Sequence, residues 1–260
     1  MGYNVAMTDN KSSEETTHFG YQEVPVSEKA GHVANVFHSV AKNYDIMNDI
    51  MSLGTHRLIK RFTVQLTALR SGQSVLDLAG GTGDFAMQFS PIIGSEGQVV
   101  LADINESMLA VGRDRIIDKG NLSNIVFSLA DAEKLPFTAE SFNCVCIAYG
   151  LRNVTNKEAA LASICRVIKP GGRLVILEFS KPRHEAVSKA YDLYSKLWPL
   201  AGKLVSGDSE SYQYLVESIR MHPDQETLKT MVLDAGFDRC EYHDVMDGIC
   251  AIHVGYKDVT

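Results

Sequence analysis

The sequence contains no run of about 18 apolar residues, so it lacks the pattern of a membrane-spanning helix. It also has no surplus of basic residues, since 25 lysines and arginines stand against 32 aspartates and glutamates and leave a net charge of −7. Nucleic-acid phosphates are bound by positively charged surfaces, so this balance argues against a nucleic-acid partner. Residues 1–22 are polar and lack the apolar segment of a signal peptide, and we predict that they are disordered.

Cysteine is scarce, with five residues in the whole chain. Cys144 and Cys146 form one close pair, but a C-x-C spacing without a neighbouring histidine does not match a metal site. We interpret both as small buried side chains of a strand. The sequence therefore predicts no metal site, and it favours a reducing, cytoplasmic environment.

Two kinds of periodicity divide the remainder. Residues 28–70 have a helical pattern, and beyond them apolar runs alternate with further helical patterns. Residues 155–158 (TNKE) read as a capping box that opens one of these helices. The strand-like runs are SVLDLA, QVVLADI, NIVFSLAD, FNCVCIAYG and GRLVILEFS. Apolar strands that alternate with helices predict a parallel sheet covered by helices on both faces.

The C-terminal part departs from this alternation. Two strand-like runs, RCEYHDVM and ICAIHVGYK, are separated by Asp247-Gly248, which is typical of a hairpin with a two-residue type I′ turn. We therefore predict an α/β fold with a mostly parallel seven-stranded sheet that ends in an antiparallel hairpin. Residues 23–260 would form one domain, with residues 28–70 as an N-terminal helical lid.

A glycine-rich turn follows the first of these strands. Residues 81–86 (GTGDFA) satisfy the G-x-G-x-x-G/A pattern, in which the glycines let the backbone approach an anionic ligand at a helix N-terminus. The pyrophosphate of NAD and the carboxylate of S-adenosylmethionine are both anions, so the pattern alone does not separate these cofactors. Gly81, Thr82 and Gly83 are the candidate contacts in this turn.

Three carboxylates favour S-adenosylmethionine. Asp77 lies in the strand ahead of the turn, where it can reach the ligand's amino group but would repel a pyrophosphate. Asp103, followed by Ile104, ends the second strand about 20 residues past the turn and suits ribose hydroxyls. Asp131 ends the third strand and suits the adenine amino group, with Ala132 packing beside it. Asp77 could instead organise the turn by bonding its amides, and Asp103 and Asp131 could be ordinary caps at strand ends, but the order of the three favours the cofactor.

Longer motifs resemble one family. From residue 16 to residue 256 the chain is similar to the ubiquinone/menaquinone biosynthesis C-methyltransferases, in THFGYQ, NYDIMND, VLDLAGGTGD, LADINESML, YGLRNV, LEFSKP and SIRMHPDQETLKTMV. The resemblance implies a class I, Rossmann-like S-adenosylmethionine-dependent methyltransferase. It places cofactor contacts at Thr82, Asp103, Asp131, Ala132 and Ala148, the last through its main chain. The implied reaction is methylation of a ring carbon of 2-methoxy-6-polyprenyl-1,4-benzoquinol or demethylmenaquinol.

Carbon methylation requires an electron-rich ring, which a hydroquinone becomes when one hydroxyl loses its proton. Arg152 and Asn153 follow the fourth strand at the expected ligand edge of the sheet. We expect Arg152 to stabilise the phenolate and Asn153 to orient a water that takes the proton. Arg152 could instead pair with a surface carboxylate, and Asn153 could start a turn. Tyr44 resembles the family's aromatic residue that closes over the cofactor or the ring.

Other assignments stay open at this point. His38, His56 and His222 are alternative proton acceptors, although each is more typical of a packing position. Residues 184–200 carry an apolar stripe that suits a groove for the isoprenoid tail, a bilayer contact, or a core or dimer contact. Its members are Val187, Ala190, Tyr191, Tyr194, Leu197 and Trp198.

Three other functions compete with quinol C-methylation. These are O- or N-methylation of another small acceptor, an NAD-dependent oxidoreductase, and a non-catalytic cofactor-binding scaffold. The expected partners are a polyprenylated benzoquinol or naphthoquinol, a second copy in a homodimer, a quinone-biosynthesis complex and, transiently, the membrane surface. We expect a cytoplasmic protein, with a peripheral position at the inner membrane surface as a variant of that expectation.

Overall fold

The computed structural model describes residues 16–40, 54–120, 123–206 and 208–259. The candidate Tyr44 lies outside these residues, as do its neighbours in the YDIMN motif. Among the described residues, no helix is long and apolar enough to cross a membrane.

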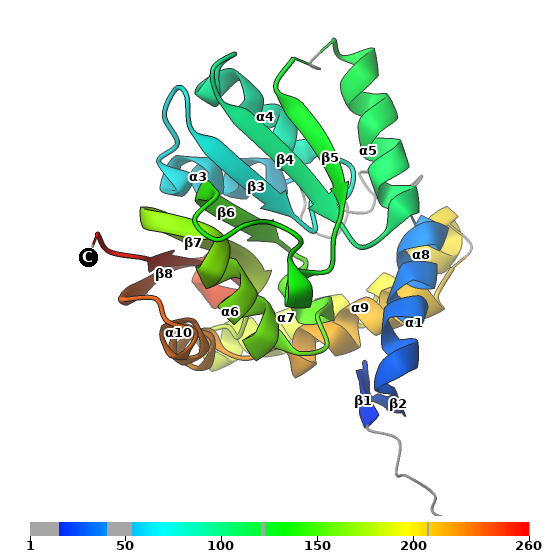
Figure 1. Ribbon diagram of the computed structural model, residues 1–260. Coiled ribbons are helices and arrows are strands. Elements are labelled where there is room, and N and C mark those ends of the chain that lie inside the picture. Colours follow the sequence, from blue (N-terminus) through cyan, green and yellow to red (C-terminus); the bar gives the residue numbers. More distant parts are fainter. Residues whose placement is uncertain (1–15, 41–53, 121–122, 207, 260) are drawn as a thin grey trace, which may run out of the picture.

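A seven-stranded sheet forms the centre of the molecule (Figure 1). Its strands stand in the order β5-β4-β3-β6-β7-β9-β8, with the first five parallel and β9 antiparallel to both of its neighbours. They are β3 (Ser74–Leu78), β4 (Gln98–Asp103), β5 (Ile125–Leu129), β6 (Phe142–Ala148), β7 (Ile168–Phe179), β8 (Arg239–Val245) and β9 (Cys250–Tyr256). The predicted mostly parallel seven-stranded sheet with a terminal hairpin is confirmed.

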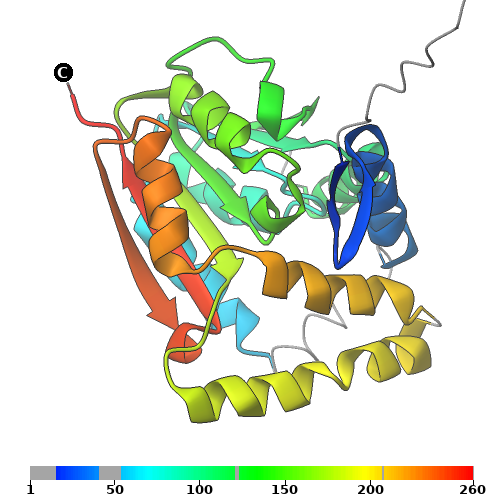
Figure 2. The same cartoon turned by 90° about the horizontal axis from the view of Figure 1, so that it is seen from below.

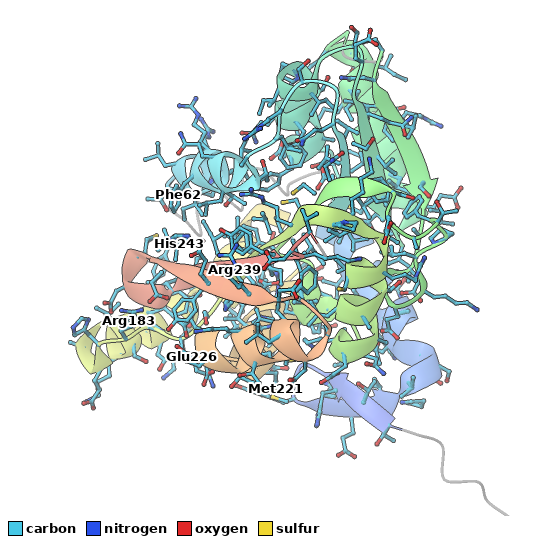
Figure 3. All side chains as sticks on the ribbon, turned by 60° about the vertical axis from the view of Figure 1, so that its left-hand side comes forward. Phe62, Arg183, Met221, Glu226, Arg239 and His243 are labelled. Carbon is cyan, nitrogen blue, oxygen red and sulfur yellow. The ribbon has the colours of Figure 1, made fainter. Side chains whose placement is uncertain are left out.

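Helices cover both faces of the sheet, because the central strands are apolar on both sides. One buried cluster joins the sheet to α3 (His56–Thr67), α4 (Asp84–Ile93) and α5 (Glu106–Asp118). The other joins it to α6 (Lys157–Val167) and α10 (Gln225–Asp234). Figure 3 shows α3 and α10 on opposite sides of β8, where Phe62 of α3 makes an edge contact with His243 at 5.8 Å between ring centroids.

Four more helices gather beyond the carboxyl ends of the parallel strands. They are α1 (Val26–Val40), α7 (Glu185–Ser195), α8 (Trp198–Ser206) and α9 (Glu210–Met221). Figure 2 shows α7 and α8 following one another along the outer border of the molecule, with α9 between them and the sheet. These helices close the edge of the sheet at which the sequence places the candidate ligands.

The N-terminal expectation is wrong in part. Residues 16–22 belong to the segment predicted to be disordered, yet β1 (Thr16–Phe19) and β2 (Gln22–Pro25) form an antiparallel hairpin. The Phe19 ring stacks on Tyr214 of α9 at a centroid distance of 4.1 Å, and the main-chain N–H of Tyr21 donates to Glu217 at 3.0 Å. These partners lie almost 200 residues away, so local composition did not reveal them.

The C-terminal hairpin forms as predicted, but its turn is longer than the two-residue type I′ turn. Val245 pairs with Cys250, which leaves four residues in the loop. The carboxylate of Asp247 accepts the main-chain N–H of His184 at 3.1 Å and contacts its ring at 2.6 Å. Contacts with residues ahead of α7 therefore shape this loop, and Met246 and Asp247 both adopt positive φ in it.

The start of α6 also differs by one residue from the predicted capping box. Asn156 caps the helix by accepting from the main-chain N–H of Ala159 at 2.9 Å. Thr155 does not cap it, because the carboxylate of Glu133 accepts the main-chain N–H groups of Thr155 and Asn156 at 3.1 and 2.8 Å. This clamp joins the start of α6 to the loop after β5.

Candidate functional site

A cavity of about 640 Å³ lies at the carboxyl edge of the sheet. The strand order reverses between β3 and β6, and a crevice at such a switch point is the usual ligand site of an open α/β sheet. The ends of β3, β4 and β6 and the loop after β5 form one side of the cavity, and α1, α7 and α9 form the other. Nearly all of the predicted cofactor residues line it, namely Asp77, Gly81, Thr82, Asp103, Ile104, Asp131, Ala132 and Ala148.

Gly83 is the exception, since it does not line the cavity. It stands before α4 with a φ of 80°, and a Cβ atom there would come within 2.9 Å of the Ile116 side chain. Glycine is needed at this position because it adopts the left-handed conformation without strain and leaves room for α5 next to the turn. Gly81 and Thr82 therefore line the cavity, whereas Gly83 packs against α5.

Asp77 is the most deeply buried carboxylate of the cofactor region, with 1% of its surface exposed. Its Oδ2 atom accepts the main-chain N–H of Ala86 at 2.8 Å, while Oδ1 has no hydrogen-bond partner among the described residues. Burial raises the pKa of this carboxyl to about 7. A carboxylate so placed needs a cation, and the amino group of S-adenosylmethionine would fit it.

Asp103 connects the glycine-rich turn to the end of β4. Its two oxygen atoms accept the main-chain N–H groups of Gly81 and Asn105, at 3.0 and 2.9 Å. Burial raises the pKa of this carboxyl as well. Each oxygen keeps a second lone pair, so the fixed carboxylate suits a pair of ribose hydroxyls. Asp131 is similarly fixed, since its Oδ1 accepts the main-chain N–H of Glu133 at 2.9 Å.

A charged cluster that the sequence did not single out lies beside the turn. The Asp84 carboxylate accepts from Lys60 at 2.6 Å and from Arg115 at 3.0 Å, and Arg115 also reaches the Thr82 hydroxyl at 3.3 Å. Lys60, Thr82 and Asp84 line the cavity. The cluster ties α3 and α5 to the start of α4, and it adds positive charge where a ligand carboxylate would lie. Lys60 and Arg115 are far from the glycine motif in sequence, so the motif gave no signal for them.

Arg152 lines the same cavity from a 3-10 turn, Leu151–Asn153, that follows β6. Its Nη1 atom donates to Glu178 Oε1 at 2.8 Å and to the main-chain carbonyl of Tyr149. The side chains of Arg152 and Glu178 are 4% and 1% exposed. The alternative of a surface ion pair is therefore wrong, because the partner carboxylate is buried in the sheet.

Glu178 holds the segment around Arg152 as well as its guanidinium. Its Oε2 atom accepts the main-chain N–H of Arg152 at 3.2 Å, and its Oε1 atom accepts that of Phe179 at 3.0 Å. The guanidinium also lies over the Phe179 ring, 5.6 Å from its centroid. The available signal for Glu178 was a lone acid in the apolar strand LVILEF.

Asn153 and the candidate histidines have different surroundings. The side-chain oxygen Oδ1 of Asn153 accepts a hydrogen bond from the Tyr214 hydroxyl at 3.0 Å, and Asn153 lines the cavity. His56 also lines the cavity, whereas His222 does not. Burial lowers the pKa of His222 well below its usual range, so this imidazole is neutral. The side chain of His38 lies outside the described residues.

Aromatic and apolar side chains of β6, β7 and the helices also line the cavity. The rings of Tyr149 and Phe179 lie 4.9 Å apart, centroid to centroid. The helices contribute Val33, Val187, Ala190, Tyr191, Tyr194 and Leu215. Four side chains of the predicted stripe in residues 184–200 thus line the cavity, namely Val187, Ala190, Tyr191 and Tyr194. Trp198 packs in a separate buried cluster. The cavity therefore combines polar groups at the strand ends with apolar side chains from the helices.

Comparison with known proteins identifies a family. A model of the ubiE/COQ5 methyltransferase family matches residues 25–257. A ubiquinone/menaquinone biosynthesis C-methyltransferase of Pseudomonas putida W619 is 65% identical over 246 residues, which cover 94% of this chain and 96% of the relative. The protein of the same name from Pseudomonas entomophila L48 is 63% identical over 255 residues, which cover 96% of this chain and 100% of the relative.

Solved structures share the fold at much lower identity. A methyltransferase of Aquifex aeolicus dependent on S-adenosylmethionine has a TM-score of 0.56 and 17% identity, over 75% of this chain and 88% of its own. Phosphoethanolamine N-methyltransferase 2 of Haemonchus contortus, in complex with S-adenosylmethionine, has the same TM-score and identity. The match covers 73% of this chain and 50% of that protein. These likenesses show the class I methyltransferase fold.

Proposed function

From the finding that this chain belongs to the ubiE/COQ5 methyltransferase family, we propose that it is an S-adenosylmethionine-dependent C-methyltransferase of ubiquinone and menaquinone biosynthesis. The acceptor is the ring of a polyprenylated hydroquinone, a benzoquinol or a naphthoquinol. The observation that carries the proposal is the buried pair of Arg152 and Glu178, which places a fixed guanidinium beside the Phe179 ring in a cavity that is also lined by the predicted cofactor residues.

S-Adenosylmethionine supplies an electrophilic methyl group on a sulfonium when it is bound. Its amino group would pair with Asp77, its ribose hydroxyls with Asp103, and its adenine would lie between Ile104 and Ala132 beside Asp131. The N–H groups of the glycine turn would take its carboxylate. The Oδ1 atom of Asp77 supports this orientation, because it is the one buried carboxylate oxygen lining the cavity that has no hydrogen-bond partner among the described residues.

Methylation at carbon needs high electron density on the ring, and a hydroquinone has it once one hydroxyl has lost its proton. The ring carbon then forms a bond to the methyl carbon as the bond from methyl to sulfur breaks, and that electron pair stays on sulfur. Loss of the hydrogen at the methylated carbon as a proton restores the aromatic ring as a phenolate, and the phenolate oxygen then takes up a proton. Two protons leave and one returns, so each turnover releases one proton in total.

Arg152 stabilises the phenolate in this scheme. Guanidinium stays protonated in proteins, so it acts as a fixed positive charge and donor rather than as a base. Glu178 and the Tyr149 carbonyl hold it in place, which removes the reorganisation that a mobile side chain would require. Asn153, itself held by Tyr214, orients the water that accepts the proton. Tyr44 as a lid residue, the homodimer and the quinone-biosynthesis complex stay predictions.

The test is transfer of isotopically labelled methyl from S-adenosylmethionine to reduced, demethylated benzoquinol and naphthoquinol without oxygen. We expect label on a ring carbon of the product, located by mass and by NMR, and no turnover of the oxidised quinones when reductant is rigorously excluded. Label on oxygen, or equal turnover of the quinones, would contradict the proposal. The ratio of the two products then measures substrate breadth.

A further inference from the structure

Helix α7 separates the cavity from the outside of the molecule. Val187, Ala190, Tyr191 and Tyr194 follow one another at helical spacing and line the cavity. Figure 2 shows that α7 and α8 form the outermost layer on this side, with α9 behind them. The opposite side of α7 therefore faces away from the other elements that the structure describes.

Large exposed apolar side chains occur in α7, in α8 and in the turn between them. Leu193 of α7, Leu197 of the turn and Leu200 of α8 are 68%, 54% and 60% exposed and are spaced three or four residues apart. A single exposed leucine is common on soluble proteins, but three within so short a stretch are typical of a contact surface. More than half of each leucine side chain is thus left uncovered by the described residues.

The charge on these helices differs in sign from that of the whole protein. Residues 185–206 contain three lysines and two acidic residues, a net charge of +1, whereas the chain as a whole carries −7. Both acidic residues are paired with a basic one, Glu185 with Lys189 at 2.7 Å and Asp192 with Arg220 at 3.2 Å. The exposed Lys189, Lys196 and Lys203 recur every seven residues beside the leucines. Lysines beside exposed leucines are the pattern of a helix that lies at the surface of an anionic membrane.

We propose that this outer face of α7 and α8 docks on an anionic phospholipid bilayer. We define the docking surface as Leu193, Leu197 and Leu200 with Lys189, Lys196 and Lys203. The leucines enter the boundary of the acyl chains, and the lysines contact the lipid phosphates. The inference rests on the proposed function, because an isoprenoid tail dissolved in the bilayer needs a short route to the cavity, and α7 provides an apolar wall on that route.

Binding to vesicles tests the docking surface directly. The full-length protein is sedimented with vesicles of phosphatidylcholine alone or with phosphatidylglycerol added. We expect binding to the anionic vesicles, and a loss of about tenfold in the variant L193S/L197S/L200S. The control I117S/L233S replaces two exposed apolar residues of α5 and α10 and should bind as the wild type does. K189E/K196E/K203E should lose the preference for anionic lipid.

Turnover distinguishes a failed docking surface from a failed function. With a short-tailed, water-soluble quinol the leucine variant should keep wild-type turnover, whereas with a long-tailed quinol embedded in vesicles it should lose about tenfold. Unchanged vesicle binding in the leucine variant would overturn the inference. A dimeric wild type that becomes monomeric in this variant would assign the surface to a second copy instead. If the wild type methylates neither quinol yet binds the vesicles through the leucines, the proposed function fails and the docking surface stands.

Discussion

The proposed cofactor end of the cavity and its proposed acceptor end are built in different ways. At the cofactor end the carboxylates accept main-chain N–H groups of the loops that follow the strands, since Asp77 accepts from Ala86 and Asp103 accepts from Asn105 and Gly81. At the acceptor end side chains pair with one another, Arg152 with Glu178 and Asn153 with Tyr214, which lie 26 and 61 residues apart in sequence. If the proposed function holds, the comparison teaches that these carboxylates are fixed by the backbone of the sheet's own loops, while the acceptor site depends on side-chain pairs between separate elements.

Replacing Arg152 by alanine should give the largest difference between the effect on turnover and the effect on cofactor binding. We expect kcat to fall about 10²- to 10³-fold because a fixed donor to the phenolate is lost, while the Kd for S-adenosylmethionine changes little. Calorimetric titration and turnover under anaerobic conditions measure the two effects. A loss of cofactor binding would instead assign Arg152 to the structure of the cofactor end.

Because R152A leaves Glu178 buried and unpaired, it should also lower the free energy of unfolding, by about 3 kcal/mol. The double variant R152L/E178L removes both charges and should recover much of this stability without recovering turnover. Denaturant unfolding of both proteins checks this separation. Equal turnover in the double variant and the wild type would exclude the proposed role.

The opposite result is expected for Asp77→Asn. The change is nearly isosteric but removes the charge that would pair with the ligand's amino group, so the Kd should rise by about ten- to a hundredfold. Turnover at saturating cofactor should fall much less. The exposed Asp118→Asn, on α5, is the matched control and should leave the Kd unaltered. An unchanged Kd in D77N would remove Asp77 from the ligand site.

The pH dependence of cofactor binding sharpens the assignment of Asp77. Burial raises the pKa of its carboxyl to about 7 in the free protein, and the cationic ligand binds the ionised form. The affinity should therefore fall by up to tenfold per pH unit below about 7, and D77N should lose that dependence. The same shift makes this group's contribution to stability fall as pH rises from about 4 to about 7, since the unfolded chain releases the proton first.

The smallest effect is expected from Tyr214→Phe. It removes the hydroxyl that donates to Asn153 and keeps the ring that stacks on Phe19. Losing one such hydrogen bond costs about 1 kcal/mol, or about fivefold in kcat, and the Kd for S-adenosylmethionine should be unaffected. Y242F removes the hydroxyl contact to Glu226, away from the cavity, as a control. A change of Kd alone would place Tyr214 with the cofactor end.

Most of the fold and the cofactor end were predictable, for a common physical reason. Strands buried on both faces must be apolar, and a ligand at their carboxyl ends is met by the residues that come directly after them. Asp103, Asp131 and the glycine turn are therefore visible in the order of residues. Glu178 was missed because an acid in a strand shows no partner until Arg152 is brought beside it, 26 residues away in sequence.

The sequence alone determined the alternation of strands and helices, the terminal hairpin and the place of Asp77, Asp103 and Asp131 at the carboxyl edge of the sheet, because each depends on hydrophobic period or on residues close along the chain. Tertiary structure alone decided the pairing of Arg152 with Glu178, the folding of residues 16–22 against α9, and the loop at Asp247. Each of these joins groups that the chain separates widely, and burial or contact energy appears only when packing brings them together. The same packing divides α7 into a side that lines the cavity and a side that is left exposed.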